Sequence, residues 1–134
     1  MSKLSDMGVN IQAAALSDTL AGGKLKIYSG KMPRDANQKV SSQKLLVTVK
    51  FDDPAFSLPV AGKIESKPLE KGEAVETGEA RWFRCETAKG KGIMDGTVGG
   101  EGSDADLVLS DTEIKKNAEI TINNFVYWIH KAGG

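Results

Sequence analysis

The sequence of 134 residues predicts a mainly β protein, an antiparallel β-sandwich or barrel preceded by one short helix. From Lys24 onward, apolar residues alternate with polar ones, which is the period of a strand with one buried face. Roughly seven or eight such segments follow one another at a spacing of about ten residues, with Gly and Pro between them. No alternation of strand and helix patterns is visible, so we do not expect a parallel α/β fold.

The helix is expected over residues 10–20. Asn10 is a good N-cap residue, and Gly22-Gly23 is a typical helix stop. A helix of this length is marginal alone, so it is expected to pack on the sheet or on a neighbouring subunit. Residues 1–9 are expected to form a flexible N-terminal arm, and residues 10–134 a single β-sandwich domain.

The first strand is expected to begin at Lys24 and to end at Gly30, and the second to span residues 45–51, where the period-two pattern is clearest. The polar residues 32–42 between them, with a proline near the start, predict a loop. A short strand is expected at residues 63–66, a loop or weak strand at 67–77, and a strand at 107–109.

A β-hairpin over residues 77–99, turning at residues 88–92, is the most informative stretch of the chain. Its first strand is bulky on both faces: Phe83 and Cys85 share one face, and Trp82 and Arg84 share the other. One face can fill a core. The other is suited to a second surface, such as another subunit.

Residues 118–130 are expected to form the last strand, and its apolar pattern changes phase. Ile120 and Ile122 share one face, whereas Phe125 and Tyr127 share the other. A β-bulge at residues 123–124 would restore a common face, and the alternative is that both faces are covered. Across all strands, the predicted core is Leu25, Ile27, Leu45, Val47, Val49, Phe83, Cys85, Met94, Val98, Leu107, Leu109, Ile120 and Ile122.

Large aromatic residues beside an arginine are typical of protein interfaces, because they bury much area at low entropic cost. We therefore predict an interface at Trp82, Arg84, Tyr127 and Trp128. Two alternatives remain open for these residues. They can be part of the core, or the aromatic rings can line a sugar-binding groove.

The composition argues against several classes of function. The formal net charge is zero, with 18 basic and 18 acidic residues, so we expect no binding to nucleic acid by bulk charge. No apolar run is long enough for a membrane span, and no signal peptide is expected. One histidine, His130, and one cysteine, Cys85, offer no catalytic pair. We expect no enzyme, metal or cofactor, and we interpret the acidic turn at residues 101–106 as a solvated loop rather than a calcium site.

Several motifs follow one another in a recognisable order. They are Leu-x-Ile-Tyr-x-Gly-x-x-Pro at 25–33, a Leu-Leu strand with Pro-Ala-Phe at 45–56, Thr-Gly-x-Ala-x-Trp-Phe-Arg at 77–84, Met-Asp-Gly-x-Val-Gly at 94–99 and Asp-Leu-x-Leu at 106–109. An Ile-containing last strand at 120–129 closes the pattern. This order resembles the short β-rich virion structural proteins of tailed bacteriophages and prophages. The chain departs from that pattern in its many charges between residues 63 and 79 and in its aromatic-rich end.

The resemblance implies a jelly-roll-like sandwich and a capsid decoration, or cement, protein that binds and stabilises the assembled shell. The alternatives are a neck, tail or baseplate component, and a carbohydrate-binding module of a receptor-binding apparatus. The implied partners are the major capsid protein or other virion proteins, together with further copies of the chain. The implied location is the virion, after synthesis in the host cytoplasm. The family offers no catalytic residues.

Overall fold

The computed structural model describes residues 5–122 and 125–128, and this part of the chain is mainly β with one helix. Helix α1 spans Asp6–Leu20 and precedes every strand. The strands are β1 (Lys24–Tyr28), β2 (Leu45–Lys50), β3 (Lys63–Glu65), β4 (Gly72–Glu73), β5 (Gly78–Glu79), β6 (Trp82–Glu86), β7 (Gly92–Gly99), β8 (Leu107–Val108), β9 (Glu113–Ile114), β10 (Glu119–Ile120) and β11 (Val126–Trp128). The prediction of a mainly β fold with a short N-terminal helix is confirmed.

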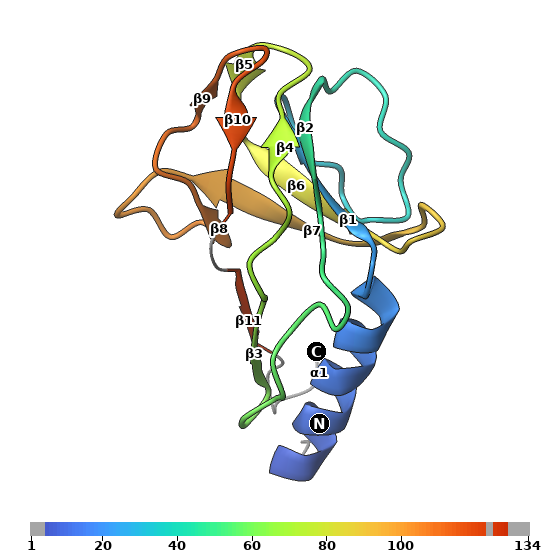
Figure 1. Cartoon of the computed structure of the whole chain (residues 1–134). Helices are drawn as coiled ribbons and strands as arrows, with labels where there is room; N and C mark the ends of the chain where they lie inside the picture. The colour runs from blue at the N-terminus through green and yellow to red at the C-terminus, as the bar shows by residue number, and fades with distance from the viewer. Residues whose placement is uncertain (1–4, 123–124, 129–134) are drawn as a thin grey trace.

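The main feature of the fold is a curled five-stranded sheet, in the order β2-β1-β6-β7-β8 (Figure 1). Its pairs are antiparallel except β7 and β8, which run parallel. Three two-stranded ribbons accompany it, β10-β4, β11-β3 and β5-β9. The β11-β3 ribbon and α1 lie below the sheet in Figure 1. The chain therefore has an upper part built on the sheet and a lower part built on the helix and that ribbon.

A β-bulge in the first hairpin decides which leucine enters the core. Ile27 pairs with Val47 and Tyr28 pairs with Leu45, so Leu46 is an extra residue in β2. An extra residue moves the following side chains to the opposite face. Leu46 is therefore fully buried and Leu45 only half-buried, and the predicted core position at Leu45 is wrong.

The helix begins earlier than expected, at Asp6, because Ser5 is its N-cap. The hydroxyl of Ser5 accepts a hydrogen bond from the backbone N–H of Gly8 at 3.1 Å, which satisfies one of the free N–H groups of the first turn. Asn10, the expected cap, lies inside the helix, and its side chain accepts from the Gly62 N–H at 2.7 Å. Of the predicted arm at residues 1–9, residues 6–9 are therefore helical and residues 1–4 lie outside the described residues.

A chain of aromatic rings joins the upper and lower parts of the core. Phe83, on β6, meets Phe125 edge to face with ring centroids 5.2 Å apart. Phe125 in turn lies 6.0 Å from Phe56, and Phe56 lies 5.7 Å from Phe51. All four side chains are at most 2% exposed, so one continuous core runs from the sheet to the β11-β3 ribbon. Ten of the thirteen predicted core residues are buried, and Leu45, Met94 and Ile120 are half-buried.

The expected last strand at residues 118–130 is two separate elements. β10 pairs with β4, whereas β11 pairs with β3. Ile122 and Phe125, which an unbroken strand would place on opposite faces, are both buried. Their burial is compatible with both expectations, a bulge between them and a strand covered on both faces. The predicted position of the bulge, residues 123–124, lies outside the described residues, as do residues 129–130.

Candidate interaction surface

Three of the four predicted interface residues have side chains that the structure describes, and none of these three is fully exposed. Trp82 is 0% exposed and Arg84 5% exposed, and both lie on β6 on the opposite face from Phe83. Tyr127, on β11, is half-buried and lines a hollow together with Phe83. Trp128 pairs through its backbone with Lys63, and its side chain lies outside what the structure describes. The interface role of these residues stays a prediction.

Trp82 is covered by neighbours from its own chain. The ring of Tyr28 stacks on it with centroids 4.4 Å apart and an angle of 13° between planes. The guanidinium carbon of Arg84 lies 5.5 Å from the centre of the Trp82 ring, within cation–π range. The second face of the hairpin strand is therefore filled by a stack from β1 and β6.

Arg84 fixes the long β1–β2 loop (residues 29–44) onto this stack. Its Nε and one terminal nitrogen donate to the two carboxylate oxygens of Asp95 at 2.7 and 2.9 Å, a bidentate pair. The guanidinium also donates to the carbonyl oxygens of Gln38 at 2.7 Å and of Asp35 at 3.4 Å. The hydrogen bond with Asp95 raises the pKa of Arg84, so the cation is held firmly in its charged form.

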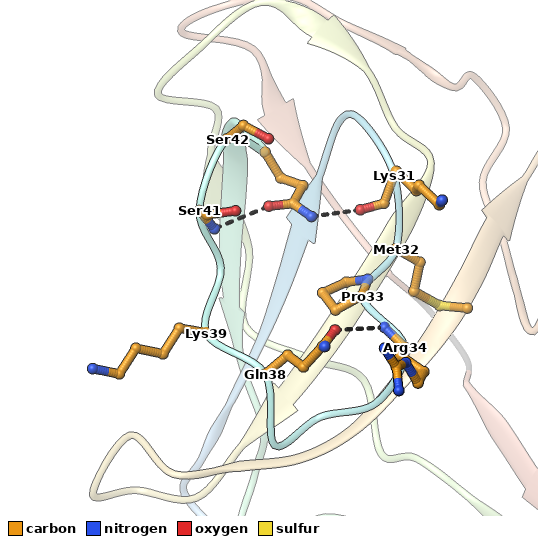
Figure 2. Close-up of a pocket in the computed structure, with 9 residues that line it drawn as sticks. Lys31, Met32, Pro33, Arg34, Gln38, Lys39, Ser41 and Ser42 are labelled. Atoms are coloured by element: carbon orange, nitrogen blue, oxygen red, sulfur yellow. Dashed lines mark hydrogen bonds between the residues drawn. The ribbon is translucent and has the colours of Figure 1, made fainter.

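The anchored loop forms an open hollow of about 800 Å³, which we call the loop cradle (Figure 2). Hydrogen bonds within the loop shape it: the Gln43 amide donates to the Lys31 carbonyl at 2.6 Å, and the Arg34 N–H donates to the Gln38 side chain at 2.8 Å. Its lining includes three cations and no acidic residue, together with the apolar side chains of Met32 and Pro33. The lining residues are Lys31, Met32, Pro33, Arg34, Gln38, Lys39, Ser41, Ser42 and Gln43.

Exposed apolar side chains gather at the other end of the molecule. Met7 is 73% exposed and Ile11 63% exposed, and their spacing places them on the helix face opposite the buried Val9 and Ala13. Leu58 and Val60, in the turn before β3, are 89% and 72% exposed. Of the seven large hydrophobic residues that are exposed in the described part of the chain, four thus come from these two segments.

Two contacts place the helix and the turn next to each other. The Asn10–Gly62 hydrogen bond ties the helix to the turn, and Ala14 and Leu58 line the same hollow of about 230 Å³. We call Met7, Ile11, Ala14, Leu58 and Val60 the helix–turn surface. Apolar patches of this kind are typical of protein contacts rather than of free surface.

Potential metal ligands are not grouped together in the described residues. Residues 5–122 and 125–128 contain no group of three His, Cys, Asp or Glu side chains placed to hold a metal ion. Burial raises the pKa of the Cys85 thiol well above its usual range, so this thiol is a poor nucleophile. His130 lies outside the described residues. Within the described part, helix α1 is neither long nor apolar enough to cross a membrane.

Comparison with known proteins gives no match to a family model, a curated protein or a solved structure. The resemblance to phage virion proteins therefore rests on the order and spacing of its motifs.

The sequence-based interpretation missed the helix–turn surface. A signal for half of it was present: Met7, Ile11 and Ala14 follow an i, i+4, i+7 pattern in addition to the Val9 and Ala13 pattern. That second stripe is recognisable only if the helix starts at Asp6. Leu58 and Val60 carry no such signal, because isolated apolar residues in a loop are common at protein surfaces.

Proposed function

We propose that the protein is a virion structural protein of a tailed bacteriophage, most specifically a decoration protein that binds the assembled capsid through its helix–turn surface. The motif resemblance supports the class, and the exposed apolar surface supports binding to another protein. The proposal also includes a location in the virion and a fold related to the jelly-roll-like sandwich of cement proteins. Of that fold, the structure shows the mainly β character.

The single observation that carries the proposal is the concentration of exposed apolar side chains on α1 and the adjoining turn. Burying one such side chain fully is worth about 1.5–3 kcal/mol, so this surface supports a contact of moderate strength. A decoration protein needs no more than this per copy. Since it binds the assembled lattice and not the separated subunits, many moderate contacts stabilise the shell by mass action.

The burial of Trp82 argues against a part for this residue in a sugar-binding groove. A sugar-binding groove needs aromatic faces open to the ligand, whereas Trp82 is covered by Tyr28 and Arg84. The neck or tail role uses the same kind of contact and differs in copy number. A stained gel of purified virions separates the two, because a decoration protein is comparable in amount to the major capsid protein and a neck component is scarce.

The contact is tested by changing apolar to polar side chains at the helix–turn surface. We expect the triple variant Met7→Gln, Ile11→Gln, Leu58→Gln to fold normally, because all three side chains are exposed. It should fail to co-sediment with capsids that lack the native chain. The matched control is Val75→Gln with Val108→Gln, which changes exposed apolar residues elsewhere and should bind like the unchanged protein. Equal binding by the triple variant would contradict the proposal.

A further inference from the structure

Five cations gather at one pole of the molecule without acidic partners. Lys31, Arg34 and Lys39 belong to the loop cradle, and Lys89 and Lys91 belong to the turn between β6 and β7. Figure 2 shows Lys39 reaching outward from the loop. Within residues 5–122 and 125–128, none of the five side chains forms an ion pair. We call these five residues the basic pole.

An acidic turn lies at the other end of β7. Between Gly92 and Ile114 the chain has six Asp or Glu residues and no Lys or Arg. Three of the six, Glu101, Asp104 and Asp106, are exposed in the turn between β7 and β8, and none forms an ion pair in the described part of the chain. We call residues 100–106 the acidic turn. Its three carboxylates equal the cations of the loop cradle in number and carry the opposite charge.

The two charged regions cannot meet within one molecule. The loop cradle lies over the Gly92 end of β7, where a Cβ on Gly92 would be only 3.0 Å from the Ala36 carbonyl oxygen. The acidic turn follows Gly99, the other end of the strand. A strand of this length separates its ends by about 25 Å. In Figure 1 the β1–β2 loop accordingly projects on the right of the sheet and the acidic turn on the left.

We propose that the loop cradle binds the acidic turn of a second copy of this chain, so that copies associate head to tail. The open hollow of about 800 Å³ admits a turn of the neighbour. Lysine and arginine side chains at its rim supply charged donors for carboxylates, and the hydroxyls of Ser41 and Ser42 supply neutral ones. The zero net charge of the whole chain allows close approach of identical copies.

The cradle is prepared for this contact by its own hydrogen bonds. Arg84 holds the loop from beneath through the carbonyls of Asp35 and Gln38, and Gln43 links its two sides. A loop that is already ordered loses little entropy when a partner binds. The contact is heterologous, because two different surfaces meet, so repetition builds a ring or an open filament. It uses neither α1 nor the turn before β3 and is independent of the proposed capsid contact.

The first test is the salt dependence of self-association, measured by sedimentation equilibrium of the full chain. At about 25 mM NaCl, charges at this separation are weakly screened, whereas at about 500 mM the screening length falls to a few Å. We expect the average mass to rise above the 14.3 kDa monomer with concentration at low salt and to return to it at high salt. A monomer at both salt concentrations would overturn the proposal.

The second test reverses each charged surface separately and then mixes the products. The first variant, the cradle variant, carries Lys31→Glu, Arg34→Glu and Lys39→Glu, so that its loop cradle and its acidic turn are both acidic. The second, the acidic-turn variant, carries Glu101→Lys and Asp104→Lys, so that both of these surfaces are basic. Each variant alone should stay monomeric at low salt, and an equimolar mixture should associate again. Asp106 is left unchanged because its carboxylate accepts hydrogen bonds from Thr97.

A matched control excludes a general effect of charge. The control variant carries Lys24→Glu, Lys50→Glu and Lys67→Glu, at three exposed lysines that form no ion pair in the described part of the chain. Its net charge changes by the same amount as that of the cradle variant. This variant should associate like the unchanged protein. The cradle variant and the acidic-turn variant must both keep their thermal unfolding midpoints. If their equimolar mixture then stays monomeric, the acidic turn is not the ligand of the loop cradle. Capsid binding by such monomeric variants reports separately on the helix–turn surface.

Discussion

At the scale of single residues, Arg84 connects more of the molecule than any other side chain described above. Its guanidinium bonds to Asp95 on the neighbouring strand and to two carbonyls of the β1–β2 loop, and it covers Trp82. From the sequence, an arginine beside a tryptophan is typical of an interface. Period-two alternation shows which residues share a face but not what covers that face. Here Tyr28 stacks on Trp82, and Arg84 bonds to the backbone carbonyl of Gln38, 46 residues away.

Replacing Arg84 by methionine should destabilise the protein strongly. Asp95 would then stay buried without its cation, and removing one partner of a buried pair typically costs about 3–5 kcal/mol. Urea unfolding measures the loss. The control is Arg81→Met, which removes an exposed pair with Glu79 and should cost less than about 1 kcal/mol. The double change Arg84→Met, Asp95→Leu should recover part of the stability, and equal losses for Arg84→Met and Arg81→Met would contradict this account.

Cys85 should make stability depend on pH above about 9. Burial raises the pKa of the folded thiol well above its ordinary value of 9.0, so the folded chain keeps the proton that the unfolded chain releases. The stabilisation is fully present below the unfolded pKa and is lost as the pH rises toward the folded pKa. Between pH 9 and 10 the loss is about 1 kcal/mol.

Urea unfolding at those two pH values, compared with Cys85→Ala, isolates the thiol, because every other titrating group is present in both proteins. The alanine variant should lose less stability over the interval. Equal slopes would show that the thiol ionises alike in both states.

At the scale of elements, the sequence predicts best what depends on neighbouring residues. The strand that begins at Lys24 is confirmed, although it ends at Tyr28 rather than at Gly30, and so is the hairpin turn between β6 and β7, since alternation and glycine act locally. The helix start is wrong because two residue types with similar capping ability, Ser5 and Asn10, compete, and the contact of Asn10 with Gly62 is not visible in the sequence. The prediction that Leu45 is a core residue of β2 is wrong, because the bulge that buries Leu46 instead has no pattern in the local sequence.

Replacing the cap residue should weaken the helix by a small, measurable amount. Ser5→Ala removes the hydroxyl that accepts from Gly8, and the loss of a cap typically costs about 1 kcal/mol. Thermal unfolding followed by circular dichroism measures it. Thr19→Ala is the control, because its hydroxyl bonds to a carbonyl of the preceding turn at an exposed site and its loss should cost less than about 0.5 kcal/mol. A Ser5→Ala variant as stable as the control would mean that the first turn contributes nothing to folding.

At the scale of the whole molecule, the continuity of the core holds the upper and lower parts together. Most of the residues predicted from alternation to be core are buried. The topology was not predictable. The parallel pairing of β7 with β8 and the pairing of β3 with β11 depend on contacts between distant segments, for which no period in the sequence gives a signal. The turn half of the helix–turn surface likewise has no signal in the sequence, because exposure depends on which elements pack together.

Phe83→Ala should destabilise the entire fold rather than one end of it. The ring links the sheet to Phe125 and thus to the β11-β3 ribbon, and replacing a buried phenylalanine costs about 3–5 kcal/mol. Unfolding followed by fluorescence and by circular dichroism should shift together. Val75→Ala, at an exposed position, should change little. Separate transitions for the two probes would indicate that the upper and lower parts unfold independently.

The way in which Arg84 holds the β1–β2 loop has an evolutionary consequence. The guanidinium bonds to backbone carbonyls at residues 35 and 38, and every residue type supplies the same carbonyl. Substitutions on the outer side of the loop therefore leave its attachment intact as long as its length is kept. Related chains can diversify this loop toward different neighbours without rebuilding the sheet below. The same property makes it a site for grafting short foreign peptides onto an unchanged scaffold.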